Sequence, residues 1–377
     1  MTEKYDNQSQ FTLPLLQWYH HAGRDLPWRQ TKDPYAVWVS EIMLQQTQVS
    51  TVLSYYKRFL SAFPTIQALA SAPLDQVLNQ WQGLGYYARA RHLHRAARVL
   101  MDQFEGTFPV LFEAVYALPG IGRSTAGAIL TIAFGQRHPI LDGNVRRVLC
   151  RFFAIKKEPH EKDVETWLWN CSRELLPKCE TDHYLQAIMD LGATICTPAR
   201  PKCKICPVIK ACCARQQGIQ ETLPIRRKRK KNPHFDYVVG VILYREEVLI
   251  RQRPFKGLLG GLWEFPGGRA GSHDPLLTES RKKKTLGLLL REEENLTLRK
   301  WEPWMEIEHA FTHFKMTLHV FTRHMKKRVE AASQLQWISK TSLPAFAFSS
   351  AHQKIVDSLQ VGRLQPERRK GGEVLFQ

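Results

Sequence analysis

The sequence predicts an all-α domain that is followed by a smaller α/β domain. Three observations support this order: helical periodicity with short Gly/Pro breaks dominates residues 1–215, a polar and basic stretch covers residues 216–233, and strand-like runs begin beyond it. We therefore expect a helical domain over residues 1–215, a basic linker over 216–233, a second domain over 234–360 and a tail over 361–377.

Length, charge and cysteine usage restrict the class of protein. The chain has 377 residues, of which 44% are hydrophobic, and its formal net charge is +19, so we expect a globular protein with a polyanionic partner. The longest apolar stretch is too short to span a bilayer, and the N-terminus lacks the basic-then-apolar order of a signal peptide. We expect a monomer with no membrane partner, in the cytoplasm and, in a bacterium, associated with the nucleoid.

Two segments are interpreted by composition alone. The linker contains an unbroken basic run, residues 226–231, which fits a solvated linker, a contact with a nucleic-acid backbone or a nuclear signal. The last residues, 371–377, end in Glu-Val-Leu-Phe-Gln and resemble the remnant of a viral 3C-type protease site, so they are excluded from fold reasoning.

A helical hairpin is predicted around residues 112–134. Apolar residues recur at helical spacing up to Leu118, Pro119 ends that helix, and Gly120 and Gly122 allow positive φ in the turn. A second helix then begins with bare backbone N–H groups, which attract a phosphate. The alternative is a hairpin that only packs in a core.

Glu41 is a candidate acid. If residues 34–63 contain a helix, Val37, Glu41 and Leu44 fall on one apolar stripe. A carboxyl group on such a stripe is desolvated, so its pKa rises and it can stay protonated near neutral pH. The alternative is a glutamate that pairs with a nearby arginine.

Asp142 is a second candidate carboxylate. It precedes a helix that is expected to begin near Asn144, so capping that helix is one role for its side chain. A role in catalysis is compatible with capping, because Asn144 can position the same carboxylate.

A cluster of cysteines has the spacing C-x6-C-x2-C-x5-C. Four thiolates within seventeen residues can close around one tetrahedral zinc ion or one iron–sulfur cubane, and spacing alone leaves both possibilities open. The four residues are Cys196, Cys203, Cys206 and Cys212.

The C-terminal part alternates like a sheet and ends in a helix. Strands are expected over 237–244, 247–251, 317–322 and 335–338, and a helix over 349–359.

These motifs together resemble the helix-hairpin-helix DNA glycosylases. The segments 38–48 and 83–91 narrow the resemblance to the MutY-type adenine DNA glycosylases, and it extends from about Leu16 to Leu359. It implies an all-α helix-hairpin-helix glycosylase domain with a [4Fe–4S] cluster loop, followed by an α/β Nudix-like domain. The implied partner is double-stranded DNA that contains an 8-oxoguanine:adenine or guanine:adenine mispair.

The resemblance also implies roles for single residues. Glu41 would protonate the departing adenine, and Asp142, positioned by Asn144, would stabilise the oxocarbenium-like sugar. The four cysteines would hold the [4Fe–4S] cluster. Residues that would line the adenine pocket are Trp28, Arg29, Leu44 and Gln186. The alternative for Trp28 and Leu44 is packing in the core, and the alternative for Gln186 is an ordinary amide on a helix surface.

DNA contacts are implied at the hairpin and at two wedge positions. Gly120 and Gly122 would hold the DNA backbone, with Ser124 of the same hairpin also contacting DNA, and Gln46 and Tyr86 would fill the gap that a flipped base leaves. Ser124 stands where related bifunctional glycosylases carry a lysine that forms a Schiff base. A hydroxyl cannot form one, so we expect base removal without an efficient lyase step.

The second domain resembles a Nudix fold without its catalytic box. Residues 262–268 match the strand and turn before that box, but residues 279–287 are basic where metal-binding carboxylates are required. The resemblance instead implies recognition of 8-oxoguanine by Phe311, Thr312 and His313. Thr312 stands where many relatives carry serine. In the other interpretation, His309, Phe311 and His313 are alternate residues of one strand face that are simply packed or solvated.

Three other functions remain in competition. An endonuclease III-like bifunctional glycosylase/lyase is disfavoured by Ser124 and by the Nudix-like domain. A nucleotide-pool pyrophosphatase is disfavoured by the basic box. A non-catalytic, cluster-bearing DNA-binding protein is disfavoured because Glu41 and Asp142 both stand in matching motifs.

Overall fold

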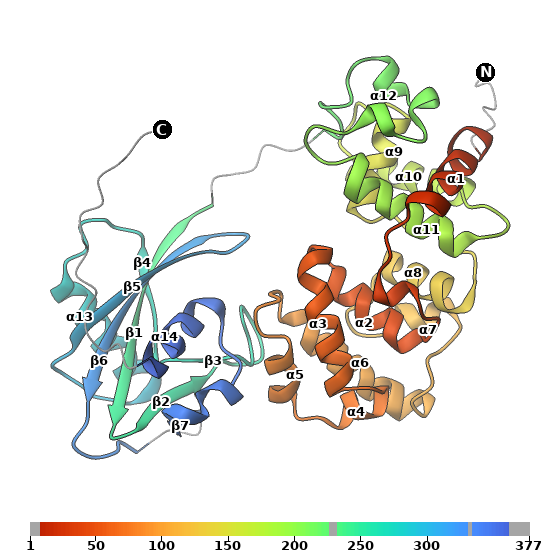
Figure 1. The fold of residues 1–377 in the computed structure, drawn as a ribbon. Coiled ribbons are helices and arrows are strands. Elements are labelled where there is room, and N and C mark those ends of the chain that lie inside the picture. Colours follow the sequence, from red (N-terminus) through yellow and green to blue (C-terminus); the bar gives the residue numbers. More distant parts are fainter. Residues whose placement is uncertain (1–7, 226–231, 331–333, 362–377) are drawn as a thin grey trace. The chain divides into compact units, whose positions relative to one another are not determined.

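The chain forms two compact units in the computed structural model, which describes residues 8–225, 232–330 and 334–361 (Figure 1). The first unit comprises residues 1–71 and 92–229, and the second comprises residues 72–91 and 230–377. The sequence-based boundaries placed residues 72–91 in the helical domain, whereas the structure groups them with the second unit. The basic run 226–231 and residues 371–377 lie outside the described residues.

The first unit is helical. Its α-helices are α1 (Leu13–Ala22), α2 (Pro34–Leu44), α3 (Val49–Ala62), α4 (Ile66–Ser71), most of α6 (Ala88–Phe104), α7 (Phe112–Tyr116), α8 (Arg123–Phe134), α9 (Gly143–Phe152), α10 (Lys162–Glu174), α11 (Thr181–Asp190) and α12 (Cys213–Gln216). Short π- and 3-10-helical turns are η1 (Gln8–Thr12), η2 (Pro27–Arg29), η3 (Leu191–Ile195), η4 (Cys203–Ile205) and η5 (Ile209–Ala211).

Helix α2 starts from a strong cap and lies in the core. The side chain of Asp33 accepts hydrogen bonds from the backbone N–H groups of Tyr35 (3.1 Å) and Ala36 (3.2 Å), and Pro34 occupies the first turn, where it needs no donor. The helix expected within residues 34–63 is confirmed: α2 carries Val37, Glu41 and Leu44 and ends at Leu44, and a second helix, α3, begins at Val49. Gln46 lies in this break with φ +55°, a left-handed conformation that interrupts a helix.

The predicted hairpin is present as α7, a tight turn and α8. Gly120 adopts φ +81°, and a Cβ atom there would lie 2.7 Å from Cβ of His92. A side chain at this position is therefore excluded both by the backbone conformation and by the close approach of α6. Gly122 is the N-cap residue of α8 and has no side chain that could accept a hydrogen bond. The first backbone N–H groups of α8 are therefore not capped by the N-cap residue.

The second unit is built on a seven-stranded sheet. Its main path runs β3-β2-β1-β6-β5, with β4 paired to β1 and β7 paired to β2; β1 and β6 are parallel and the other pairs are antiparallel. The strands are β1 (His234–Tyr244), β2 (Glu247–Gln252), β3 (Trp263–Glu264), β4 (Gly267–Ser272), β5 (Glu302–Ala310), β6 (Lys315–His324) and β7 (Leu335–Ser339). The helices are α5 (Leu74–Gln80), α13 (Glu279–Glu294), the 3-10 turn η6 (Lys340–Ala345) and α14 (Ser350–Gln360). The strand that the Nudix resemblance implied within residues 262–268 is present as β3, whereas β4, β5 and α13 were not predicted from the sequence.

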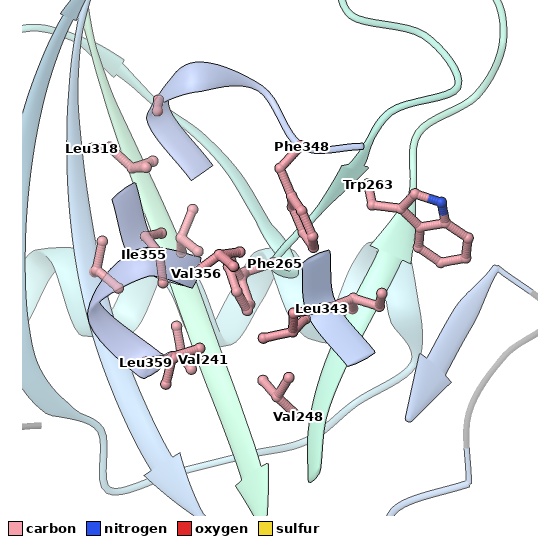
Figure 2. Close-up of a cluster of buried hydrophobic side chains, with 14 of the residues drawn as sticks. Val241, Val248, Trp263, Phe265, Leu318, Leu343, Phe348, Ile355, Val356 and Leu359 are labelled. Carbon is pink, nitrogen blue, oxygen red and sulfur yellow. The ribbon is translucent and has the colours of Figure 1, made fainter. Parts of the chain in front are cut away.

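Strand β1 is buried on both faces of the sheet. Val239 and Val241 belong to one core cluster with α14, while Val238 and Ile242 belong to a second cluster with α13. This alternation follows the two-residue period of a strand. The first cluster, with Phe265, Phe348, Ile355 and Val356 among its side chains, is shown in Figure 2.

Among the described helices, none combines the length and the apolar character that a membrane span requires.

Candidate active site

A cavity of about 1030 Å³ opens within the first unit. The elements around it include α2, the N-terminal ends of α8 and α9, and α11. Ten of the predicted site residues line it: Trp28, Arg29, Glu41, Leu44, Gln46, Gly122, Ser124, Asp142, Asn144 and Gln186. The remaining DNA-contact residues, Gly120 and Tyr86, are not in its lining.

Glu41 is placed in this cavity as a weak acid. Burial, the largest effect, and the negative charge of Asp142 both raise the pKa of Glu41, the positive charge of Arg29 opposes them, and together they bring it to about 7. A carboxyl group with this pKa is about half protonated at neutral pH, so it can donate a proton.

Asp142 caps helix α9 and faces the same cavity. Its Oδ1 accepts a hydrogen bond from the backbone N–H of Val145 (2.7 Å), and its Oδ2 accepts one from Nδ2 of Asn144 (3.3 Å). Burial raises the pKa of Asp142, whereas these hydrogen bonds stabilise the ionised form and lower it; the net direction is upward. The capping role that the sequence suggested is thus present, and the carboxylate still borders the cavity.

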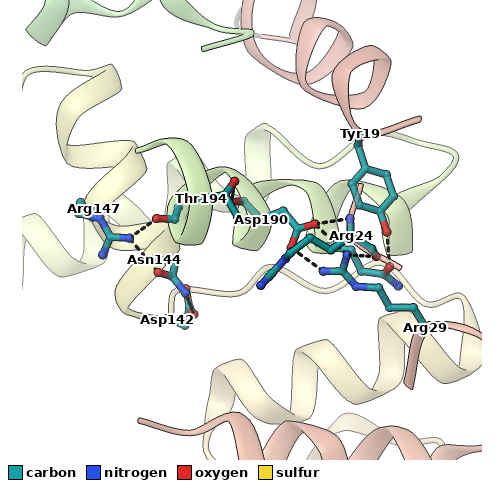
Figure 3. A network of polar contacts seen from close by, with 10 residues as sticks. Tyr19, Arg24, Arg29, Asp142, Asn144, Arg147, Asp190 and Thr194 are labelled. Atoms are coloured by element: carbon teal, nitrogen blue, oxygen red, sulfur yellow. Dashed lines mark hydrogen bonds and ion pairs between the residues drawn. The ribbon is translucent and has the colours of Figure 1, made fainter. Parts of the chain in front are cut away.

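Arg147 holds Asn144 from behind. Its Nη2 donates to Oδ1 of Asn144 (2.8 Å) and to the carbonyl of Gly192 (2.6 Å), and its Nε donates to the carbonyl of Cys196 (2.7 Å). A Cβ atom on Gly192 would lie 2.6 Å from Cβ of Asn144, so only glycine allows this approach. Figure 3 shows Arg147, Asn144 and Asp142 in one connected group.

A second polar group lies around Asp190, which is fully buried (Figure 3). Arg29 donates to both of its oxygens (2.7 and 2.8 Å), and Arg24 donates to them through its side chain and its backbone N–H. Burial would raise the pKa of Asp190, but the hydrogen bonds from these arginines outweigh it and hold the pKa below its ordinary value. Nearby, the hydroxyl of Tyr19 donates to Oε1 of Gln186 at 2.5 Å. Arg29 and Gln186 are therefore held in fixed positions in the cavity wall.

Ser124 connects the hairpin to the segment that carries Asp142. Its Oγ accepts a hydrogen bond from the backbone N–H of Leu141 at 2.9 Å. The hydroxyl therefore fixes the residue directly before Asp142. From the sequence, Ser124 was assigned to DNA binding and to the position of a missing lysine, and this contact was not predicted.

The four predicted metal ligands line one small cavity beside α9. Cys196, Cys203, Cys206 and Cys212 share it with apolar side chains and with Arg151, whose Nη1 donates to Sγ of Cys196 at 3.3 Å. Arg151 is almost fully buried and also donates to the carbonyls of residues 197 and 198 in the same loop. Four sulfurs around one cavity with a buried cation beside them suit a metal centre that carries thiolate ligands.

Comparisons with known proteins identify the family. A model of HhH-GPD superfamily base excision DNA repair proteins matches residues 39–174, and a NUDIX domain model matches residues 238–358. Adenine DNA glycosylase of Homo sapiens is 36% identical over a gapped alignment of 402 positions. The alignment covers 92% of this chain and 73% of that protein. The chain belongs to the adenine DNA glycosylase family.

Two further comparisons agree with this assignment. Adenine DNA glycosylase of Buchnera aphidicola subsp. Schizaphis graminum is 39% identical over 311 residues, with 82% of this chain and 86% of that protein covered. The solved structure of a thermostable thymine-DNA glycosylase is similar over 56% of this chain and 97% of its own, at 28% identity and a TM-score of 0.51. Adenine DNA glycosylases are hydrolases of N-glycosyl bonds, and the helical unit has the fold of this class of repair enzymes.

In this family member, Tyr86 lies against the predicted 8-oxoguanine loop. Its hydroxyl is 2.8 Å from Oγ1 of Thr312, and both residues belong to the second unit. Phe311 to Phe314 form the turn between β5 and β6, closed by a 2.8 Å hydrogen bond from Phe311 N–H to the carbonyl of Phe314. Thr312 and His313 are therefore at the tip of a hairpin rather than on a strand face. The contact links positions 226 residues apart in sequence, which no local pattern could predict.

The Nudix-like unit does contain converging carboxylates, but an arginine lies among them. Arg251 donates to Glu264 (2.5 and 3.0 Å), to Glu293 (2.6 Å) and to Glu294. Burial would raise the pKa of Glu264, but the charges of Arg251 and Arg253 outweigh it and lower the pKa. Sequence reasoning examined only the basic N-terminal half of α13 and missed the acidic end of the same helix. The Arg251 guanidinium occupies the position toward which these carboxylates point.

Proposed function

We propose that this enzyme, acting as a monomer on double-stranded DNA, removes adenine that is mispaired with 8-oxoguanine or guanine. The observation that carries the proposal is the pairing of a protonatable Glu41 with a capped Asp142 on one cavity of about 1030 Å³. The cavity can hold a flipped nucleotide, since enzymes that act on a base take it out of the stack.

Glu41 and Asp142 divide the chemistry. Glu41 donates a proton to the adenine ring, so that the base leaves as a neutral species when the N-glycosidic bond breaks. The sugar then becomes oxocarbenium-like, and the carboxylate of Asp142 faces its positive charge before water attacks. Asn144 keeps Asp142 oriented through the 3.3 Å hydrogen bond, and Arg147 in turn holds Asn144.

The adenine pocket is formed by the remaining cavity residues. Trp28 and Leu44 supply apolar surface, and Arg29 and Gln186 supply polar groups whose positions are fixed by Asp190 and Tyr19. Gln46, exposed in the break between α2 and α3, fills the gap that the flipped base leaves. The hairpin glycines Gly120 and Gly122 let backbone N–H groups bind the DNA phosphates.

The 8-oxoguanine is read by the second unit. Phe311, Thr312 and His313 stand at the tip of the β5–β6 hairpin, and the contact of Tyr86 with Thr312 supports a role for Tyr86 at this damaged base in addition to its predicted wedge role. The hydroxyl groups of both residues can donate or accept hydrogen bonds.

The four cysteines hold a [4Fe–4S] cluster. Family membership and the shared cavity of Cys196, Cys203, Cys206 and Cys212 support this assignment, and the buried Arg151 offsets the negative charge of the thiolates. The cluster supplies structure and DNA docking in this family rather than a chemical step. A purified protein without iron and brown colour would favour zinc instead.

One assay tests the proposed reaction. The protein is incubated with a duplex that contains one 8-oxoguanine:adenine pair, and free adenine is measured alongside strand cutting with and without alkali. We expect adenine release and strand cutting only after alkali, because Ser124 offers no amine for a Schiff base.

Each rival function has its own outcome in that assay. Absence of adenine release, with the duplex still bound, would indicate a non-catalytic DNA-binding protein. Strand cutting without alkali would indicate a lyase. Replacement of Glu41 by glutamine should abolish release while leaving duplex binding intact, and continued release would show that Glu41 is not the acid.

A further inference from the structure

A cluster of two histidines and a glutamate lies outside the cavity, where α1 meets α11. His20 belongs to the last turn of α1, Glu180 directly precedes α11, and His183 belongs to the first turn of α11. Nε2 of His20 is 3.0 Å from Oε1 of Glu180, and Nδ1 of His183 is 3.3 Å from the same oxygen. One ligand atom from each of the three residues lies within 4.8 Å of the other two.

We propose that His20, Glu180 and His183 form a Zn²⁺ site that joins α1 to α11. Two imidazoles and one carboxylate are a ligand set that zinc uses, with bonds of about 2.0–2.2 Å. In a tetrahedron with such bonds, ligand atoms are about 3.4 Å apart. The separations of the two imidazole nitrogens from Oε1 of Glu180, 3.0 and 3.3 Å, are close to that value, and the three ligand atoms lie within 4.8 Å of one another, so side-chain rotations can bring all three to one zinc ion.

The surroundings of the cluster also suit a cation that keeps one coordination position open to solvent. The side chains of His20, Glu180 and His183 are 44%, 47% and 44% exposed, so an ion can enter from solvent and a water molecule can complete the coordination. His20 lies at the C-terminal end of α1, where the helix dipole favours positive charge. The His20 and His183 rings meet edge to face with centroids 5.5 Å apart, which already orients both toward the carboxylate.

The proposed site lies close to one wall of the base cavity. Tyr19 precedes His20, its ring centroid is 5.9 Å from that of His183, and its hydroxyl holds Gln186 one turn further along α11. An ion bound to both helices therefore restricts the motion of Tyr19 against Gln186. This consequence rests on the proposed role of Gln186, whereas zinc binding itself does not.

A calorimetric titration tests the site. ZnCl₂ is added to the purified protein, which keeps the metal bound to its four cysteines. All variants carry Cys179→Ser, because this exposed thiol directly precedes Glu180 and could bind zinc by itself. We expect the background protein to bind one more Zn²⁺ than the His20→Ala/His183→Ala variant. Glu180→Gln, which keeps the shape of the side chain, should weaken binding at this site at least about tenfold.

His21→Ala is the matched control. His21 is also exposed in α1 but its Nδ1 bonds to the carbonyl of Gln17, so this variant should bind zinc as the background does. Equal stoichiometry and affinity in the background and the double variant would overturn the proposal. Adenine release from DNA is measured in parallel for the background and each variant. If a variant loses zinc binding but retains adenine release, the zinc site is separate from the proposed reaction. If no protein releases adenine, only the proposed function is overturned.

Discussion

Replacement of Glu41 by glutamine should stabilise the protein in a pH-dependent way. The folded protein holds a carboxyl group with a pKa of about 7, whereas the unfolded chain has the ordinary value of 4.5. Between pH 4.5 and about pH 7 the folded state retains a proton that the unfolded state has released. The contribution of Glu41 to the free energy of unfolding therefore falls as the pH rises through this range, and it stays constant above about pH 7. Glutamine cannot ionise and escapes this loss.

The magnitude follows from the size of the shift. At about pH 8.5, where Glu41 is ionised in both states, its raised pKa costs about 3 kcal/mol, since one pKa unit corresponds to about 1.4 kcal/mol. At about pH 5.5 the folded state keeps Glu41 protonated while the unfolded chain is ionised, and the cost is about 1 kcal/mol. The free energy of unfolding of the Glu41→Gln variant minus that of the wild type should therefore be about 2 kcal/mol larger at about pH 8.5 than at about pH 5.5. The same substitution removes the proposed acid, so stability is gained where activity is lost.

Urea denaturation of the helical unit, followed by tryptophan fluorescence, measures this difference. Wild type and variant are compared at each pH, so the titration of all other groups cancels. Glu221→Gln is the control, because Glu221 is exposed and its replacement should change stability equally at both pH values. If the advantage of Glu41→Gln were the same at both pH values, Glu41 would not carry a raised pKa and the assignment of the acid would lose its physical basis.

Three further substitutions test contacts in the two units. Ser124→Ala leaves the Leu141 N–H without its acceptor, so we expect about 1 kcal/mol less stability and adenine release slowed several-fold in single-turnover assays, with strand cutting still dependent on alkali. Asp190→Asn removes the buried negative charge that the partly exposed Arg24 and Arg29 share, and should lower the free energy of unfolding by about 3–5 kcal/mol in urea denaturation; a loss below about 1 kcal/mol would show that the pairing contributes little. Arg251→Met leaves three carboxylates facing one another, so the thermal midpoint of the second unit should fall and should rise again with Mg²⁺, an effect that wild type should lack.

Local patterns in the sequence predicted the parts of the site that depend on near neighbours. The hairpin followed from Pro119 and two glycines, and the cap at Asp142 from a carboxylate directly before a helix. The raised pKa of Glu41 followed from its place on the apolar stripe of a helix, which the structure contains as α2.

Contacts between distant segments could not be predicted in this way. The Ser124 hydroxyl reaches Leu141 across 17 residues, and Tyr86 reaches Thr312 across 226. The grouping of residues 72–91 with the second unit depends on the same kind of contact. Arg251 was overlooked for a different reason: an arginine in a strand has no pattern that identifies three acidic partners from β3 and α13.

Helix α9 explains how a cysteine loop can affect chemistry that it does not perform. Asp142 caps its N-terminal end and faces the cavity, while Arg151 near its C-terminal end donates to Sγ of Cys196 and to the carbonyl of Thr197. Arg147, between them, donates both to Asn144 and to the carbonyl of Cys196. Because a short helix moves as one rigid element, a displacement of the Cys196 loop is transmitted to the N-terminal turn that orients the Asp142 carboxylate. We therefore expect the proposed metal centre to stabilise the proposed catalytic geometry through backbone carbonyls and the two buried arginines, Arg147 and Arg151.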